Sequence, residues 1–242
     1  MKPFVFAHRG ASGYEIENTI PSFKKAVRME AGIETDVQET KDKKLICFHD
    51  YFIEANSEKY DLKRITLKKL RSLKFIDNRK IPSVQEVFEL FHKNHSLRYS
   101  FDIRDKFAGF KLIDIAKRFN ILDRIEITER RLKCISSLRS YNKKVKIVHT
   151  LPEIIKQVNK NTVNFDMLKN LEVYAINLIF LRSSFDNFKE IIDNGFKCYI
   201  WSVNAKSRMK KVLKLKFKNE GVDAIYTDYP DIFINLRDQI KG

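Results

Sequence analysis

Short apolar runs that are typical of buried strands recur along the whole chain, with helical patterns between them. Nine such runs lie at residues 4–7, 32–37, 45–48, 97–103, 125–127, 145–148, 173–177, 198–201 and 224–226. Strands that alternate with helices in this way predict an α/β fold with a parallel sheet. A chain of 242 residues has a usual length for an eight-stranded barrel of this type. We therefore expect a (β/α)8 TIM barrel that forms one domain over residues 1–242.

Nine runs are one more than such a barrel needs, and loop length identifies the extra strand. Only twelve residues separate Asp36 from His49, too few for two strand segments and a helical crossover but enough for a hairpin. Residues 41–44 form the expected turn, and a turn centred on residues 42 and 43 places Asp36 directly opposite His49. The run at 45–48 is then a hairpin arm beside the second barrel strand.

Other segments differ from the simple alternation or refine it. Residues 50–80 are polar, lysine-rich and weakly periodic, and we interpret them as an insertion over the barrel rim with a short helix that starts near Thr66. An apolar stripe at residues 20–31 predicts a helix with Thr19 as its N-cap. Ser83 and Glu86 have the spacing of a capping box and predict a further helix from residue 84.

Polar residues suited to catalysis lie where the predicted barrel strands end, which is where barrel enzymes place their active sites. These strand-end residues are His8, Asp36, Asp102 and Trp201. His8 and His49 can each exchange protons near neutral pH. Arg9 follows His8 directly, and its planar guanidinium matches the oxygens of a phosphate group.

Two carboxylates, Glu34 and Asp36, are one residue apart on the second predicted strand. Ile33, Thr35 and Val37 hold the alternate positions and should pack outward, so both carboxylates should point into the barrel. Two acids that face each other in a barrel repel strongly, and a divalent cation with oxygen ligands removes that repulsion. The sequence leaves open whether this cofactor is Mg²⁺ or Ca²⁺. Together with the histidines and Arg9, this pair indicates metal-assisted cleavage of a phosphate ester.

Several short motifs resemble, in order and spacing, those of the glycerophosphodiester phosphodiesterase family. They are His8-Arg9-Gly10, Glu17-Asn18-Thr19, Glu34-Thr35-Asp36, His49-Asp50, IPSVQE at 81–86, FDIR at 101–104, IWSVN at 200–204 and GVDAIYTDYP at 221–230. The resemblance implies a barrel with a rim insertion, and hydrolysis of a glycerophosphodiester to glycerol 3-phosphate and an alcohol. It also implies that His8 and His49 act as general acid and base, and that Glu17 supports the site near His8 and the metal.

One motif departs from the family pattern, because Asp102 and Arg104 stand where the resembled enzymes usually have Glu and Lys. Asp is shorter than Glu by one methylene, whereas Arg is longer than Lys and forked. We expect Asp102 to be the third metal carboxylate, because alternation places it and Arg104 on one face of the strand. Asp105 is a possible substitute, but it should point to the opposite face if the strand continues that far.

Three residues are expected to bind the substrate. Arg9 and Arg104 would contact its phosphate group, and Trp201 would form an apolar wall of the pocket. Trp201 is the single tryptophan of the chain and could instead belong to the core.

Net charge is the one unusual feature of the composition, at +16. Residues 1–50 hold eight basic and eight acidic residues, so the whole excess lies in residues 51–242. Such a surface could attract nucleic acid, anionic lipid or a phosphate substrate. We expect a solvated exterior that steers anions and no nucleic-acid partner, because no basic stripe interleaved with aromatic residues accompanies the charge. The oligomeric state stays open.

The sequence contains no apolar run long enough to cross a bilayer, and the residues before His8 leave no room for a signal peptide. We therefore expect a cytoplasmic location. The scattered cysteines Cys47, Cys134 and Cys198 indicate reduced, buried thiols.

Two rival functions remain: a lysophospholipase D-type lipid phosphodiesterase on the same scaffold, and a non-catalytic relative that binds phosphate or nucleic acid. An apolar groove would favour the first, and a missing histidine or acid would favour the second.

Overall fold

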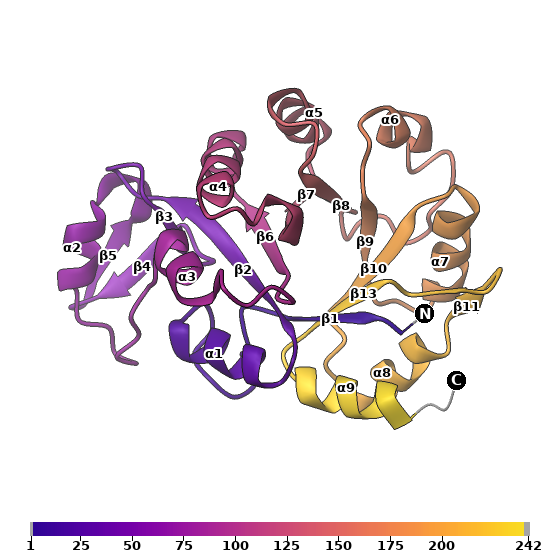
Figure 1. The fold of residues 1–242 in the computed structure, drawn as a ribbon, viewed down its shortest axis with the longest axis horizontal. Coiled ribbons are helices and arrows are strands. Elements are labelled where there is room, and N and C mark those ends of the chain that lie inside the picture. Colours follow the sequence, from indigo (N-terminus) through magenta and orange to yellow (C-terminus); the bar gives the residue numbers. More distant parts are fainter. Residues whose placement is uncertain (1, 240–242) are drawn as a thin grey trace.

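The computed structural model describes residues 2–239 and contains a closed barrel of eight parallel strands (Figure 1). The barrel strands are β1 (Phe4–Ala7), β2 (Gly32–Glu39), β6 (Tyr99–Ile103), β7 (Ile125–Glu129), β8 (Lys146–Thr150), β9 (Ala175–Ile179), β10 (Lys197–Trp201) and β13 (Ala224–Thr227). They neighbour one another in chain order, and β1 pairs with both β2 and β13, which closes the sheet. The predicted TIM barrel is confirmed.

Helices follow the strands and cover the outside of the barrel (Figure 1). They are α1 (Ile20–Arg28), α3 (Val84–Phe91), α4 (Lys106–Arg118), α5 (Leu132–Tyr141), α6 (Phe165–Asn170), α7 (Ser184–Asp193), α8 (Lys206–Leu213) and α9 (Pro230–Gln239). Thr19 caps α1, and the capping box of Ser83 and Glu86 opens α3, as predicted. Helix α1 ends before the predicted residue 31, because Glu30 adopts a left-handed backbone with φ of 58°.

Strand β3 (Leu45–Cys47) pairs antiparallel with β2 and lies outside the barrel, as predicted, but its predicted register is wrong. Val37 pairs with Cys47, and the amide of Phe48 donates to the carbonyl of Asp36 at 3.0 Å, so Phe48 rather than His49 lies opposite Asp36. The cause is the turn, which has three residues and ends at Lys43 in the left-handed region with φ of 61°. A turn with an odd number of residues moves the register by one position from that of a two-residue turn.

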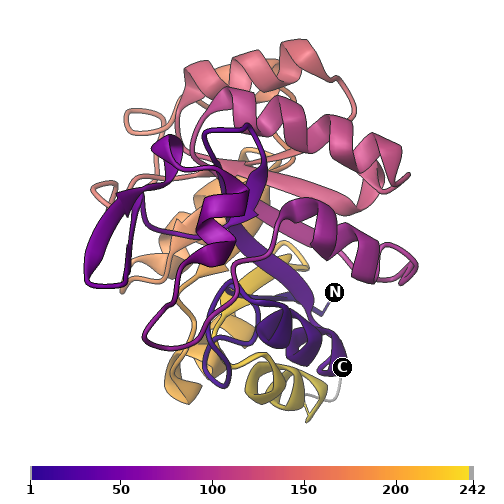
Figure 2. The same cartoon turned by 90° about the vertical axis from the view of Figure 1, so that its left-hand side faces the viewer.

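The chain after β3 forms the expected insertion, which stands in front of the barrel in Figure 2. It contains a hairpin of β4 (Phe52–Ala55) and β5 (Glu58–Asp61), a short 3₁₀ turn at Leu62–Arg64 and helix α2 (Leu67–Ser72). Helix α2 starts next to Thr66, as predicted, and the Thr66 side chain caps it. The hairpin was not predicted, because Asn56 and Ser57 form its turn with positive φ angles and no glycine marks the position.

A small apolar cluster of its own holds the insertion together. Its buried members are Ile46, Phe48, Ile53, Ala55, Leu62, Leu70, Leu73 and Ile81. They come from β3, the hairpin, α2 and the segment that leads to α3. The insertion is therefore packed on its own interior as well as attached to the barrel through β3.

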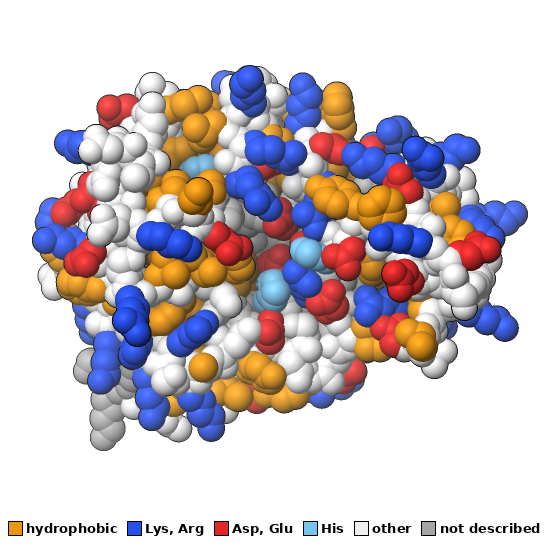
Figure 3. Space-filling model, turned by 180° about the vertical axis from the view of Figure 1, so that it is seen from behind, with side chains coloured by type: hydrophobic (Ala, Val, Ile, Leu, Met, Phe, Trp, Pro, Cys, Tyr) orange, Lys and Arg blue, Asp and Glu red, His pale blue; other side chains and the backbone are white. Residues whose placement is uncertain are grey.

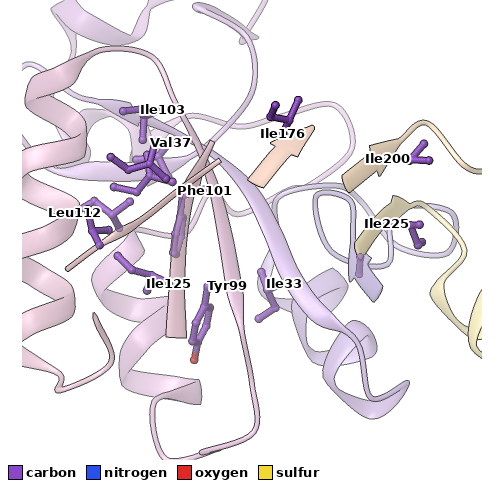
Figure 4. Close-up of a cluster of buried hydrophobic side chains, with 14 of the residues drawn as sticks. Ile33, Val37, Tyr99, Phe101, Ile103, Leu112, Ile125, Ile176, Ile200 and Ile225 are labelled. Atoms are coloured by element: carbon purple, nitrogen blue, oxygen red, sulfur yellow. The ribbon is translucent and has the colours of Figure 1, made fainter. Parts of the chain in front are cut away.

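The main core lies between the barrel and its helices, as Figure 4 shows. Outward-facing residues of neighbouring strands build it, among them Ile33 and Val37 of β2 and Phe101 and Ile103 of β6. Inside the barrel a second cluster, which includes Phe6, Tyr199 and Tyr226, fills the space between the strands. The ring of Phe6 stacks on that of Tyr226 with centroids 5.3 Å apart.

Two further features complete the fold. Cys47, Cys134 and Cys198 are buried free thiols, as expected. None of the helices within residues 2–239 combines the length and the apolar character that a bilayer crossing requires.

Candidate active site

A cavity of about 280 Å³ opens at the carboxyl end of the barrel strands. Its lining residues include His8, Arg9, Glu34, Asp36, His49, Asp102, Arg104, Thr128, Glu129, Arg130, Leu151, Glu153, Asn177 and Trp201. In Figure 3 two histidine patches lie beside acidic and basic patches around this hollow. Thus all the site residues expected from the sequence line one cavity except Glu17, which lies behind Arg9 and accepts a hydrogen bond from it at 2.8 Å.

His8 is held by an aspartate from the opposite end of the chain. Its Nδ1 lies 2.8 Å from Asp228, whose other carboxylate oxygen accepts from the side-chain amide of Asn204. The hydroxyl of Ser12 also donates to Asp228, at 3.1 Å. Burial lowers the pKa of His8, but the Asp228 hydrogen bond and the charge of Glu34 outweigh it, so the pKa is raised. Because Nδ1 is engaged, Nε2 is the ring nitrogen that can exchange protons in the cavity.

His49 lies on the chain segment that enters the insertion, and polar groups of the barrel hold its backbone. The side-chain amide of Gln38 donates to the carbonyls of Phe48, His49 and Asp50 at 2.7–2.9 Å. The guanidinium of Arg104 donates to the same His49 carbonyl. The Nδ1 of His49 lies 2.7 Å from the carboxylate of Asp50. These contacts bring His49 to the cavity although it is not paired opposite Asp36.

Three carboxylates come from two adjacent strands. Glu34 and Asp36 lie on β2, and Asp102 on β6 is the register partner of Asp36. Burial and the nearby acids raise the pKa of Glu34 to about 8, against the opposing charge of His8 and the Arg9 amide. Burial and the charge of Asp36 raise the pKa of Asp102 to about 7. The nearby positive charges therefore do not fully balance the negative charge of these three carboxylates.

Arg9 reaches these acids through an unusual backbone turn. Its φ is 53° and that of Gly10 is 76°, so both residues occupy the left-handed region. Gly10 is required here, because a Cβ atom would lie 2.3 Å from the hydroxyl of Ser22. The turn lets the backbone amide of Arg9 donate to the carboxylate of Glu34 at 2.7 Å. The Nε atom of the Arg9 side chain lies 3.2 Å from the carboxylate of Asp36.

The remaining predicted residues lie on the walls of the cavity. Trp201 lines it with a partly buried ring. The guanidinium of Arg104 stacks on the ring of Tyr51 at 5.0 Å. Asp105 does not line the cavity, because its carboxylate caps α4 by accepting from the amides of Phe107 and Ala108, both at 3.0 Å.

Sequence reasoning missed several polar residues of the site. Asp228, Asn204 and Asn18 all belong to recognised motifs, yet no role was assigned to them. Asn18 is buried between two groups of β2: it donates to Asp36 at 3.1 Å and accepts from Thr35 at 2.5 Å. Glu129 is the last residue of β7 and Arg130 follows it, and only this position at a strand end could have indicated them.

The donor set fits a divalent cation in its chemistry. Glu34, Asp36 and Asp102 offer oxygen ligands on two neighbouring strands at the wall of one cavity, and hard cations prefer such ligands. As placed within residues 2–239, no three acidic, histidine or cysteine side chains stand close enough together to enclose an ion. Arg9 occupies the space beside Asp36, so the carboxylates would have to draw together around a bound cation.

A TIM barrel with two histidines and three acids at the carboxyl ends of its strands has the layout of an enzyme. The chain belongs to the glycerophosphoryl diester phosphodiesterase family, whose model matches residues 8–232. Members that carry this activity are phosphoric diester hydrolases.

Individual relatives cover nearly the whole chain. A glycerophosphodiester phosphodiesterase of Caldanaerobacter subterraneus is 31% identical over 98% of both chains. Among solved structures, a glycerophosphodiester phosphodiesterase from Parabacteroides distasonis has a TM-score of 0.81 at 21% identity, covering 98% of this chain and 97% of that one. A phosphodiesterase of Oleispira antarctica, solved with the product sn-glycerol-3-phosphate, has a TM-score of 0.80 at 19% identity, with 98% of each chain covered.

Gln38→Ala should loosen the segment that carries His49, because it removes the amide that holds three carbonyls. We expect faster amide hydrogen exchange across residues 48–51 and a loss of roughly 1–3 kcal/mol in the free energy of unfolding. Gln85→Ala is the matched control, since that exposed amide donates to Glu89 and, within residues 2–239, to no backbone carbonyl. Equal exchange at 48–51 in both variants would show that Gln38 does not hold this segment.

Proposed function

We propose that this chain hydrolyses a glycerophosphodiester to glycerol 3-phosphate and an alcohol, with the help of a divalent cation. The observation that carries the proposal is the convergence of His8, His49 and the three carboxylates on one cavity. The volume of about 280 Å³ suits a small polar phosphodiester. Family membership and the product bound in the Oleispira antarctica relative support the same choice of substrate.

The two histidines would share the proton transfers. One imidazole removes a proton from the attacking hydroxyl group, and the other protonates the alkoxide that leaves phosphorus. The nucleophile is either water or the neighbouring glycerol hydroxyl, which would give a cyclic phosphate first. Asp228 positions His8 through Nδ1, and Asp50 has the corresponding contact with His49.

Glu34, Asp36 and Asp102 would hold the cation, which, when bound, neutralises negative charge that develops on the phosphoryl oxygens. The raised pKa values of Glu34 and Asp102 support this assignment, because a buried acidic cluster needs positive charge to stay ionised. Mg²⁺ and Ca²⁺ both satisfy an oxygen-only donor set.

Arg9, Arg104 and Trp201 would bind the substrate. Each lines the cavity, where the guanidinium groups can donate to phosphate oxygens and the indole can pack against apolar substrate atoms. Glu17 would act indirectly, by fixing the guanidinium of Arg9 at 2.8 Å.

A water-soluble substrate is favoured over one whose acyl chain is bound by the protein. The structure does contain a larger cavity of about 970 Å³, lined by both apolar and charged side chains, between α1, α3 and the insertion. It shares no lining residue with the cavity of the histidines. An acyl chain bound there would not be continuous with a phosphodiester at the site.

The direct test is release of glycerol 3-phosphate from glycerophosphocholine, measured with and without EDTA. We expect turnover that chelation abolishes and that added Mg²⁺, Ca²⁺ or Mn²⁺ restores, because the acidic cluster lacks sufficient positive charge without a cation. Full activity in exhaustively chelated protein would contradict the cation requirement. Absence of turnover with every cation would favour the non-catalytic relative.

His8→Ala and His49→Ala should each lower kcat by about 10² to 10⁴, the usual contribution of a general acid or base. Both variants should keep the wild-type unfolding midpoint and cation affinity. The control is His95→Ala, which removes an exposed imidazole that precedes the start of β6, at the end of the barrel opposite the cavity. A variant whose turnover stays within a factor of three of wild type would remove that histidine from the mechanism.

Asp102→Ala should weaken cation binding measured by isothermal titration calorimetry by about tenfold or more, because one of three carboxylate ligands is lost. Asp102→Glu should retain binding, since it restores the residue usual in the family. Asp105→Ala is the matched control on the same segment, and it should leave affinity unchanged because that carboxylate caps α4. If only the Asp105 variant lost affinity, the assignment of the third ligand would be reversed.

A further inference from the structure

Large apolar side chains are exposed unevenly over the molecule. Within residues 2–239 the exposed ones are Tyr14, Ile16, Tyr51, Phe52, Ile76, Leu90, Phe107, Tyr141, Ile154, Met167 and Phe185. Single exposed apolar residues are normal on a protein surface. Most of these, however, lie in the insertion or in the segments that follow strands β1, β6, β8 and β9, which all emerge around the mouth of the cavity.

The two most exposed of them lie on different sides of this mouth. Ile76, at 103% relative exposure, belongs to the insertion, and Ile154, at 85%, belongs to the segment after β8. Ile76 lines a surface hollow together with Asp50 and Tyr51, the residues next to His49. Ile154 directly follows Glu153, which lines the active-site cavity. Side chains this exposed gain nothing from the fold itself.

Basic side chains accompany the apolar ones at the mouth. The ammonium of Lys59 lies 4.7 Å from the ring centre of Phe52, and that of Lys106 lies 5.3 Å from that of Phe107. Residues 51–80 carry nine Lys and Arg against four Asp and Glu. Figure 3 shows basic and apolar patches on both sides of the hollow.

Some acids at the mouth already have basic partners. Asp77 pairs with Arg79 at 2.7 Å, and Asp105 lies 3.6 Å from Lys63. Each such pair uses one acid and one base, so the excess of basic over acidic residues in 51–80, nine against four, leaves the insertion side of the rim with a net positive charge. A surface that combines exposed apolar side chains with positive charge matches the interface of an anionic bilayer, where the apolar groups insert and the cations meet lipid phosphates.

We propose that the rim of the cavity, defined by Tyr51, Phe52, Ile76, Phe107, Ile154 and the lysines beside them, docks the protein on an anionic lipid surface. Ile76 and Ile154 enter the headgroup region, and Lys59 and Lys106 contact lipid phosphates. Docked in this way, the cavity of the histidines faces the bilayer. The proposal does not rest on the proposed activity, because the rim lies outside the cavity whichever phosphodiester is cleaved.

Co-sedimentation of the full chain with vesicles tests the docking surface. One set of vesicles contains equal parts of phosphatidylglycerol and phosphatidylcholine, and the other contains phosphatidylcholine alone. We expect the protein to bind the anionic vesicles and to bind the neutral ones at least about tenfold more weakly. Binding to the anionic vesicles should also decline as the salt concentration is raised. Equal binding to both sets, or no binding to either, would overturn the proposal.

Matched variants separate the rim from the general positive charge of the molecule. Ile76→Ser combined with Ile154→Ser should weaken vesicle binding about tenfold. Leu90→Ser is its control, since Leu90 is half-exposed near the end of α3. Lys59→Gln combined with Lys106→Gln should weaken binding about tenfold or more, whereas the same change at Lys210 and Lys211 of α8 should have little effect.

All the substituted side chains are exposed, so unfolding midpoints should stay at the wild-type value and exclude misfolding. Equal losses in the rim and control variants would overturn the proposal, because binding would then follow total charge. A single-stranded RNA oligonucleotide is the final probe. If it binds more tightly than the anionic vesicles, and the isoleucine variant leaves both kinds of binding unchanged, the basic rim serves nucleic acid instead of lipid.

Discussion

The active site depends on the alternation of side chains along β2, a strand whose eight residues are all buried. Ile33 and Val37 face outward and tie the strand to the helices. Glu34 and Asp36 face the cavity. Gln38, further along the same inward face, holds the segment of His49. Because a one-residue slip of β2 would exchange these two sets, the core and the site cannot be placed independently of each other.

The concentration of acid at this strand explains the surrounding polar structure. Arg9 contributes both its amide and its guanidinium to the acids, which requires left-handed backbone at Arg9 and Gly10. Asn18 adds an amide donor to Asp36. Such a conformation costs about 1–3 kcal/mol for a residue other than glycine, and the hydrogen bonds that it allows offset this cost. The turn after β1 is thus shaped by the charges on β2.

Most of the barrel could be predicted from sequence, because its signals are local. Each strand and helix has its own periodicity, and residue alternation sufficed to put Asp102 and Arg104 on the cavity side. The hairpin register was predicted wrongly, since it depends on whether the turn holds two or three residues, and Lys43 gives no sign of its left-handed backbone.

The contacts between residues far apart in the sequence could not be predicted, for a different reason. The contact between His8 and Asp228 joins residues 220 positions apart, and only closure of β1 on β13 brings them together. Asn204 reaches Asp228 in another way, through the pairing of the consecutive barrel strands β10 and β13. The exposed apolar rim was also missed, since the average composition of residues 50–80 is polar and hides a few isolated apolar side chains.

The separate apolar cluster of the insertion has a consequence for how the protein responds to heat. His8 belongs to the barrel, whereas His49 lies between two supports: Gln38 and Arg104 tie its carbonyl to the barrel, and its neighbour Phe48 belongs to the cluster of the insertion. The insertion has far fewer buried residues and can open locally while the barrel stays folded. On warming, we therefore expect the insertion to loosen before the barrel unfolds, so that the cavity loses its order on the side of His49 while His8 stays in place.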